Sequence, residues 1–111
     1  GSSSSSQSYI FTPGTILSNG EVYVIAHPSS SYTGTIDDTF GWSFNGNDAV
    51  ELQTTTNISV DIIGNIGDTL DFAKDITLRK KNGIGPSIIY SLTDYDQFPV
   101  DTFTGLGFHS Y

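Results

Sequence analysis

The 111-residue chain contains no cysteine and no methionine, and only four of its residues are lysine or arginine. Without cysteine, disulfide bonds, thiolate catalysis and cysteine-built zinc sites are excluded. The formal net charge of −8 argues against nucleic acid as a partner, because phosphate binding relies on clustered basic side chains. The sequence also lacks a run of about 18 apolar residues, so it predicts no membrane insertion.

Aromatic and turn-forming residues are abundant instead. The chain holds six tyrosines, seven phenylalanines and twelve glycines, and ten of its twelve acidic residues are aspartate. Aromatic and β-branched residues favour strands, whereas aspartate beside glycine is typical of turns. No segment keeps the i, i+3, i+4, i+7 spacing of an amphipathic helix for three turns. The length and the pattern together predict one all-β domain, a sandwich or a barrel.

The order of the segments can be predicted from turn signals and alternating residues. Residues 1–7 are rich in serine and predict a flexible linker or tag, followed by a single domain over residues 8–111. Asn45-Gly46 is a strong hairpin signal, and it predicts that residues 40–44 pair with residues 49–53. Further strands are expected at residues 8–12, 21–26, 58–63, 76–80 and 88–92.

Five blocks of the sequence, taken in order, are similar to those of bacterial lamin tail domains. They are residues 20–26 (GEVYVIA), 45–52 (NGNDAVEL), 61–67 (DIIGNIG), 75–81 (DITLRKK) and 98–109 (FPVDTFTGLGFH). The resemblance covers residues 20–109 and implies an immunoglobulin-like β-sandwich. Such modules usually belong to secreted or surface bacterial proteins, so an extracellular or cell-surface location is expected. The family has no agreed catalytic residues to carry over.

The chain departs from the family pattern at its beginning, where the opening strands of the family have no counterpart. The resemblance therefore predicts an N-terminally incomplete domain with an open sheet edge. An open edge invites pairing with another chain. The expected partner is a protein: a second copy, a separate fragment or a neighbouring domain.

Asp37 and Asp38 are the candidate metal ligands, with Asp48 and Asp68 as further sources of oxygen for Ca²⁺. Calcium takes about six to eight oxygen ligands, and the sequence has no calcium loop of the EF-hand type. The alternative is that these aspartates only stabilise turns. His27 and His109 lack the spacing of a zinc pair.

The chain has more aromatic residues than a core of this size requires. Tyr32, Trp42, Tyr90, Tyr95 and Phe98 are candidates for a surface that binds sugars or peptides. The alternative is that their rings hold the sandwich together. The sequence leaves both interpretations open.

Two segments match acceptor patterns for glycosylation. Residues 57–59 (NIS) match the N-glycosylation pattern at Asn57. Residues 68–70 (DTL) resemble the Asp-Thr-aliphatic acceptor for O-glycosylation in Bacteroidetes, with Thr69 as the acceptor. Each lies in or beside an expected loop.

No arrangement of serine, histidine and acid indicates nucleophilic catalysis, and no glycine-rich phosphate loop is present. No catalytic residue and no organic cofactor is therefore predicted. The favoured function is a non-catalytic interaction or structural module that self-assembles through a sheet edge. The alternative is an accessory domain that binds carbohydrate or another substrate for a secreted hydrolase or nuclease.

Overall fold

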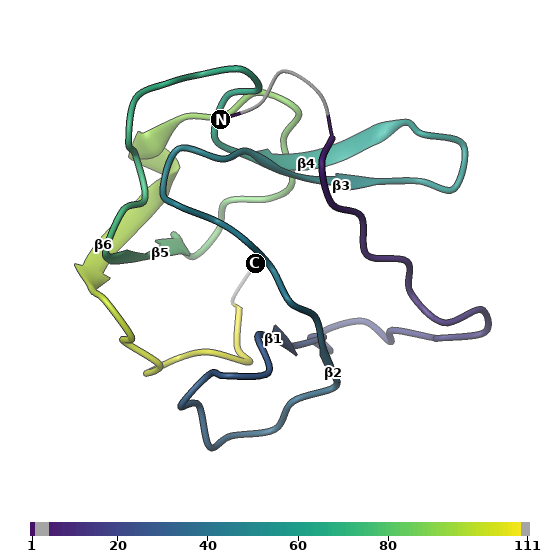
Figure 1. Cartoon of the computed structure of the whole chain (residues 1–111). Coiled ribbons are helices and arrows are strands. Elements are labelled where there is room, and N and C mark those ends of the chain that lie inside the picture. Colours follow the sequence, from purple (N-terminus) through teal and green to yellow (C-terminus); the bar gives the residue numbers. More distant parts are fainter. Residues whose placement is uncertain (2–4, 110–111) are drawn as a thin grey trace.

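The computed structural model describes residue 1 and residues 5–109. Within these residues the chain forms short strands, one 3₁₀ turn and no α-helix (Figure 1). The elements are β1 (Ile25–Ala26), β2 (Asp38–Thr39), β3 (Val50–Gln53), β4 (Ser59–Ile63), β5 (Ile76–Lys80), η1 (Leu92–Asp94) and β6 (Tyr95–Pro99). The prediction of a small all-β domain is confirmed at this level.

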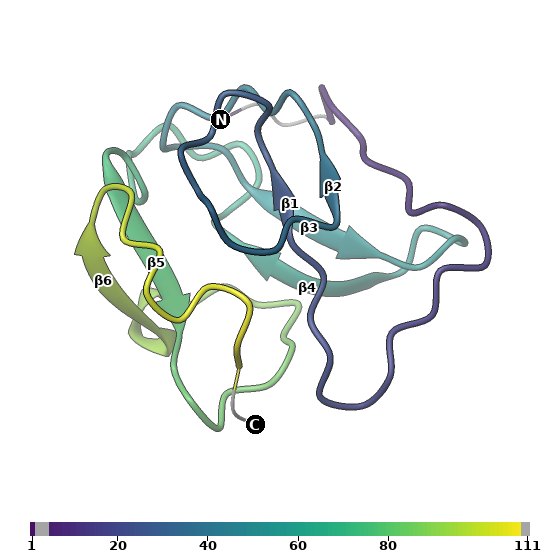
Figure 2. The same cartoon turned by 90° about the horizontal axis from the view of Figure 1, so that it is seen from below.

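The strands form three separate two-stranded sheets. β1 and β2 are parallel, with Ile25 opposite Asp38. β3 and β4 are antiparallel, and so are β5 and β6. The view from below shows β1 and β2 side by side, with the β3–β4 pair crossing beneath them and the β5–β6 pair at one flank (Figure 2).

The β3–β4 hairpin turns at residues 54–57, where the sequence predicts a polar turn. Asn57 has a φ of 63°, a conformation that asparagine tolerates better than most residues. Its backbone N–H donates to the Thr54 carbonyl at 3.0 Å, and the Ile58 N–H donates to the Thr54 hydroxyl at 3.1 Å. Local side-chain chemistry thus closes this hairpin.

The hairpin predicted at Asn45-Gly46 does not form. Residues 40–44 belong to no strand, and the Gly46 carbonyl accepts hydrogen bonds from Phe72 N–H at 2.9 Å and Ala73 N–H at 3.0 Å. The Asp48 carboxylate accepts from Asn45 N–H at 2.9 Å. The turn therefore connects the N-terminal half to the segment before β5, rather than joining two neighbouring strands.

Two predicted strands are shortened or absent in the N-terminal half. Of residues 21–26 only β1 is regular, and residues 8–12 form no strand. Here side chains provide bonds that a ladder would otherwise supply. The Gln7 side chain accepts from Ser43 N–H at 2.8 Å and donates to the Gly41 carbonyl at 3.0 Å.

In the C-terminal half, the strand predicted at residues 76–80 is present as β5. The structure after β5 differs from the prediction. The strand predicted at residues 88–92 is replaced by bends and η1, because the Ser87 hydroxyl bonds locally to the backbone of Ile89. β6 was not predicted. It pairs over its full length with β5, from Tyr95 opposite Lys80 to Pro99 opposite Ile76.

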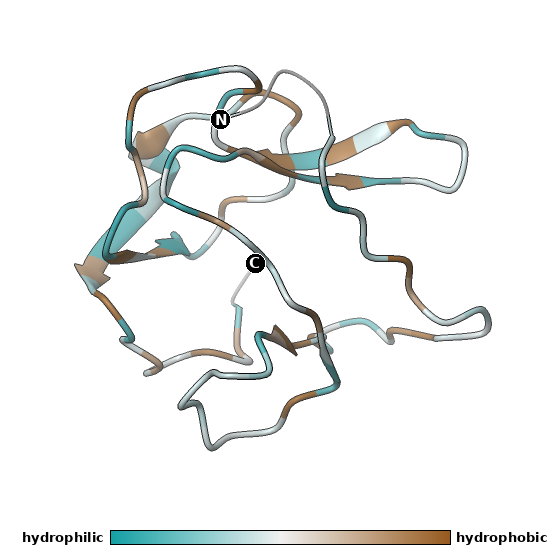
Figure 3. Ribbon diagram, viewed as in Figure 1, coloured by the Kyte–Doolittle hydropathy of each residue, from teal (hydrophilic) through white to brown (hydrophobic). Residues whose placement is uncertain are grey.

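The hydrophobic core is small. Val24, 8 % exposed, is the only buried hydrophobic side chain among the described residues. The accessible surface is 7846 Å², whereas a folded monomer of this mass exposes about 5,900 Å². Hydrophobic residues are spread along loops as well as strands (Figure 3). Across the described residues, no helix is long and apolar enough to span a membrane.

Candidate functional site

A groove of about 670 Å³ runs along the edge of β1 that faces away from β2. The strand side of the groove is formed by residues 22–26, and the opposite side by Phe103, Leu106 and Phe108 of the C-terminal segment. That segment leaves β6 and returns across the molecule toward β1 (Figures 1 and 2). Most of the lining is apolar, which suits a site that recognises hydrophobic groups.

The backbone at this edge of β1 offers hydrogen-bonding groups to the groove. Val24 and Ala26 point their carbonyls toward β2, where they accept from Asp37 N–H at 2.9 Å and Phe40 N–H at 3.0 Å. Because alternate residues of a strand direct their backbone groups to opposite edges, the N–H and carbonyl of Ile25 point into the groove. Neither group of Ile25 has a partner outside the strand ladders among the described residues.

Tyr32, one of the predicted binding residues, lies at the groove. Its ring packs against Phe103 with centroids 5.3 Å apart. The loop that carries it turns at His27, whose carbonyl accepts from Ser30 N–H at 2.9 Å and whose Nδ1 accepts from Ser29 N–H at 3.0 Å. A ring pair thus stands beside an unpaired backbone edge.

Trp42 lies in a different place, within a cluster of aromatic rings in the N-terminal half. It packs against Phe40 with centroids 4.4 Å apart and stacks on Phe44 at 5.2 Å with an interplanar angle of 16°. Tyr9 contacts Phe40 and Trp42 edge-on or tilted. The cluster comprises Tyr9, Phe11, Tyr23, Phe40, Trp42 and Phe44.

Tyr90 and Tyr95 are brought together near β5, with ring centroids 5.8 Å apart, and Phe72 packs on Tyr90 at 5.3 Å. Burial raises the pKa of both phenols, and the Asp61 and Asp94 carboxylates raise the pKa of Tyr95 further. Phe98 lies on β6 beneath the Arg79 guanidinium at 4.4 Å. The predicted aromatic residues therefore occupy four separate places and form no single platform.

Asp37 and Asp38, the predicted calcium ligands, both bond to the protein. Asp37 accepts from Val24 N–H at 2.7 Å. Asp38 accepts from the Tyr9 hydroxyl and from its neighbour Thr39 N–H. These two bonds hold the pKa of Asp38 below its usual range, and the bond to Asp38 is the main cause that raises the pKa of Tyr9. Within residues 1 and 5–109, no cluster of three or more acidic or histidine side chains is placed to hold a metal.

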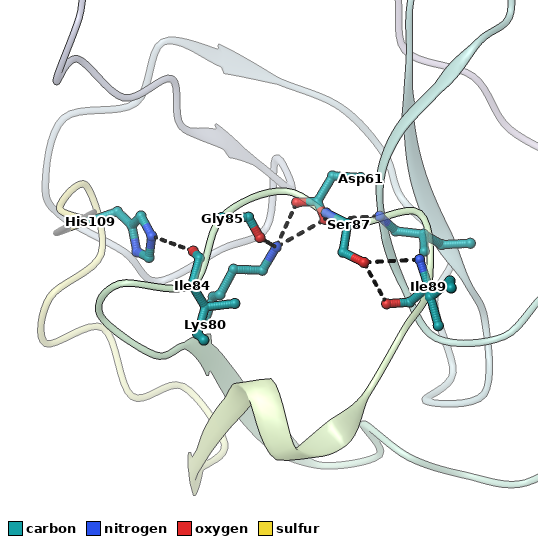
Figure 4. Close-up of polar contacts among 8 residues, drawn as sticks. Asp61, Lys80, Ile84, Gly85, Ser87, Ile89 and His109 are labelled. Atoms are coloured by element: carbon teal, nitrogen blue, oxygen red, sulfur yellow. Dashed lines mark hydrogen bonds and ion pairs between the residues drawn. The ribbon is translucent and has the colours of Figure 1, made fainter.

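Asp61 and Lys80 form an ion pair that the sequence did not single out (Figure 4). Lys80 Nζ donates to both carboxylate oxygens of Asp61 at 2.9 Å and to the Gly85 carbonyl at 3.2 Å. Asp61 also accepts from Ser87 N–H at 3.0 Å. The pair fastens β4, β5 and the loop after β5 together. The alternation of polar and apolar residues predicted that both residues lie on strands. No feature of the sequence indicated that these two strands are neighbours.

The remaining candidates are exposed. Asn57 and Thr69 are both open to solvent in turns, and Asp68 accepts from Leu70 N–H at 3.0 Å beside Thr69. Both positions are accessible to a modifying enzyme. His109 contacts the Ile84 carbonyl at 3.2 Å (Figure 4).

Comparison of the chain with family models, curated proteins and solved structures found no match in any of the three.

Proposed function

We propose that the chain is a non-catalytic interaction module of the immunoglobulin-like β-sandwich class, which associates with a second copy of itself through an open sheet edge. The observation that carries the proposal is the extent of surface left uncovered. The chain exposes 7846 Å², about 1,900 Å² more than a folded monomer of its mass. Association would cover part of that surface and add to a small core.

The open edge of β1 supports the same conclusion. Exposed strand edges invite pairing with other chains unless they are covered, charged, interrupted or very short. β1 has two residues, so its free edge offers the N–H and carbonyl of one residue, Ile25. The backbone groups of Ile25 face a mostly apolar groove, and no charged side chain of β1 itself blocks them. The resemblance to lamin tail domains also fits an interaction role and a secreted or cell-surface setting.

Light scattering on the purified protein over a wide range of concentrations tests the proposal. We expect a dimer or larger assembly that dissociates on dilution. The melting temperature should rise with protein concentration, because association stabilises the folded state by mass action. A monomer at every concentration, with a constant melting temperature, would contradict the proposal.

The stacked pair of Trp42 and Phe44 favours a second candidate function, an accessory domain that binds carbohydrate for an enzyme. The two rings are nearly parallel, and Phe44 is 52 % exposed, so a sugar ring has an apolar surface on which to pack. A carbohydrate array tests this candidate. Binding that is lost in Phe44→Ala would support it, and no binding to any sugar would contradict it.

Modification of the module is a separate proposal, based on the two exposed acceptor positions. Thr69 would carry an O-linked glycan in a secreted bacterial protein, and Asn57 an N-linked one in a host that has the machinery. The intact mass of the protein from its natural source tests both. A mass equal to that of the sequence would contradict both modifications.

A further inference from the structure

We propose that residues 15–18 of one copy add as a β-strand to the free edge of β1 in a second copy. The proposal rests on the self-association proposed above and names the two surfaces that meet. It assigns an acceptor, the groove beside β1, and a donor, the segment of sequence Thr-Ile-Leu-Ser between two turns.

The acceptor has the backbone groups that strand addition requires. The Ile25 N–H and carbonyl face the groove, while the bonds of β1 to β2 use Val24 and Ala26. An added strand would therefore complete the bonding of Ile25 without breaking the existing pair. This is the arrangement in which an extended peptide extends a sheet, with main-chain bonds for affinity and side-chain pockets for selection.

The mostly apolar lining of the groove also favours an added strand with hydrophobic side chains. Val22 and Ile25 lie on the strand side, and Phe103, Leu106 and Phe108 on the opposite side. Phe108 is 81 % exposed in the single chain. On an added strand, one of the two adjacent aliphatic side chains, Ile16 or Leu17, would cover these rings and gain from their burial.

The donor segment is exposed and bounded by turns. Ile16 is 83 % exposed and Leu17 is 54 % exposed. The Thr15 N–H donates to the Thr12 carbonyl at 3.0 Å before the segment, and the Glu21 N–H donates to the Ser18 carbonyl at 3.0 Å after it. Figure 1 shows the purple loop that contains this segment projecting from the side of the molecule. Two large aliphatic side chains are thus presented to solvent by a short segment between two turns.

Charge favours this donor over other parts of the chain. Two copies that each carry a net charge of −8 repel one another. Residues 1–20 contain no charged side chain, so this segment can approach another copy without adding to that repulsion. Among the residues that line the groove, Asp101 is the only acid.

The uncovered area is larger than one contact needs. A standard interface buries about 800 Å² from each partner. The excess of about 1,900 Å², a total for the chain, exceeds that amount. Because the donor and the groove are different surfaces, the contact is head-to-tail, which builds a ring or an open chain.

Substitutions on each side of the contact test the proposal by light scattering. The donor variant Ile16→Asp/Leu17→Asp should reduce the assembly to a monomer, since successive side chains of a strand point to opposite faces and one of the two carboxylates enters the apolar groove in either register. The matched control Leu70→Asp/Ile66→Asp adds the same charges at two exposed aliphatic positions, 72 % and 57 % exposed, and should leave the assembly intact.

Two acceptor variants block the groove in different ways. Ser29→Trp fills it from an exposed loop position that lines it. Ile25→Pro removes the N–H that faces it, and an edge position tolerates this change best. Circular dichroism of each variant at low concentration establishes that the chain is folded. We expect both folded variants to be monomers.

Mixing the donor variant with Ser29→Trp completes the test. Each is a monomer alone, but the Ser29→Trp copy keeps its donor and the other copy keeps its groove, so the mixture should form a one-to-one complex. Assembly that persists in the donor and acceptor variants would overturn the inference and leave self-association standing. A wild-type monomer at all concentrations would overturn both, and a mixture that stays monomeric would overturn the donor–groove pairing.

Discussion

The two halves of the molecule are held together by different kinds of bonds. Residues 50–99 form two antiparallel pairs with four or five residues in each strand, and the Asp61–Lys80 ion pair fastens them. Residues 5–48 contain only a two-residue parallel pair, supported by aromatic rings and carboxylates. The first half therefore depends on side chains, and the second on backbone ladders.

The junction between the halves gives the largest predicted effect. Gly46 has a φ of 100°, and a Cβ there would lie 2.5 Å from the Lys74 backbone. Gly46→Ala should lower the free energy of unfolding by about 3 kcal/mol, from positive-φ strain together with the steric clash. Urea unfolding monitored by circular dichroism measures it.

Gly14→Ala is the matched control for that change. Gly14 has a similar φ of 88°, but nothing lies within 4 Å of its added Cβ. It should cost about 1 kcal/mol, the price of the positive φ alone. If the two substitutions had equal effects, the contact between Gly46 and Lys74 would not hold the halves together.

The second largest predicted effect on stability comes from removing the charge of Asp61, which lies in the C-terminal half. Asp61→Asn keeps the shape but removes the carboxylate that accepts from Lys80 and Ser87. The side chains are 32 % and 16 % exposed for Asp61 and Lys80, so the expected loss is about 2 kcal/mol. Chemical denaturation of the variant measures it. Asp71→Asn, at an exposed position, should change stability little, and an equal loss there would refute the role given to Asp61.

The smallest predicted effect is the pH dependence of the N-terminal half. The Tyr9 bond lowers the pKa of Asp38, so its stabilisation is present above the unfolded value near 3.9 and is lost as pH falls through the folded pKa. The same bond raises the pKa of Tyr9. The stabilisation linked to Tyr9 is present below pH about 10, the pKa of tyrosine in the unfolded chain. It is lost as pH rises through the pKa of Tyr9 in the folded protein.

Tyr9→Phe keeps the ring and removes the hydroxyl that makes this bond. An NMR titration should show the Asp38 pKa moving up toward its ordinary value in Tyr9→Phe. Equal Asp38 pKa values in the two proteins would disprove the bond.

The comparison of halves also explains where the sequence was informative. β4 and β5 alternate polar and apolar residues within ladders, and their positions were predicted within a residue or two. β6 was not predicted. It ends at Pro99, and proline is tolerated at the end of an edge strand. The Asn45-Gly46 hairpin was predicted wrongly because a turn signal does not specify which segment donates to the Gly46 carbonyl, here the N–H groups of Phe72 and Ala73.

The candidate site was harder to predict than the strands. Tyr32 was singled out, but the groove needs the C-terminal segment to return to β1, which brings together residues about 80 positions apart along the chain. Asp37 and Asp38 carry the acid expected of calcium ligands, yet their bonds to Val24 and Tyr9 come from tertiary contacts. The residue types indicated that these side chains accept hydrogen bonds or bind a cation. Only the fold shows which groups they bond to.

The separation into three small sheets has a consequence for the order of folding. The β3–β4 hairpin closes through four turn residues, whereas β5 and β6 are joined through residues 81–94 and the parallel pair depends on rings as distant as Tyr9 and Trp42. Short loops close first because they lose less chain entropy. In pulse-labelled hydrogen exchange, amides of β3 and β4 should gain protection earliest, because theirs is the shortest of the three connections. The groove beside β1, proposed above as an association surface, needs residues 103–108 to reach β1 across about 80 positions of the chain. Such a distant contact closes late, so the groove should be completed after the β3–β4 hairpin.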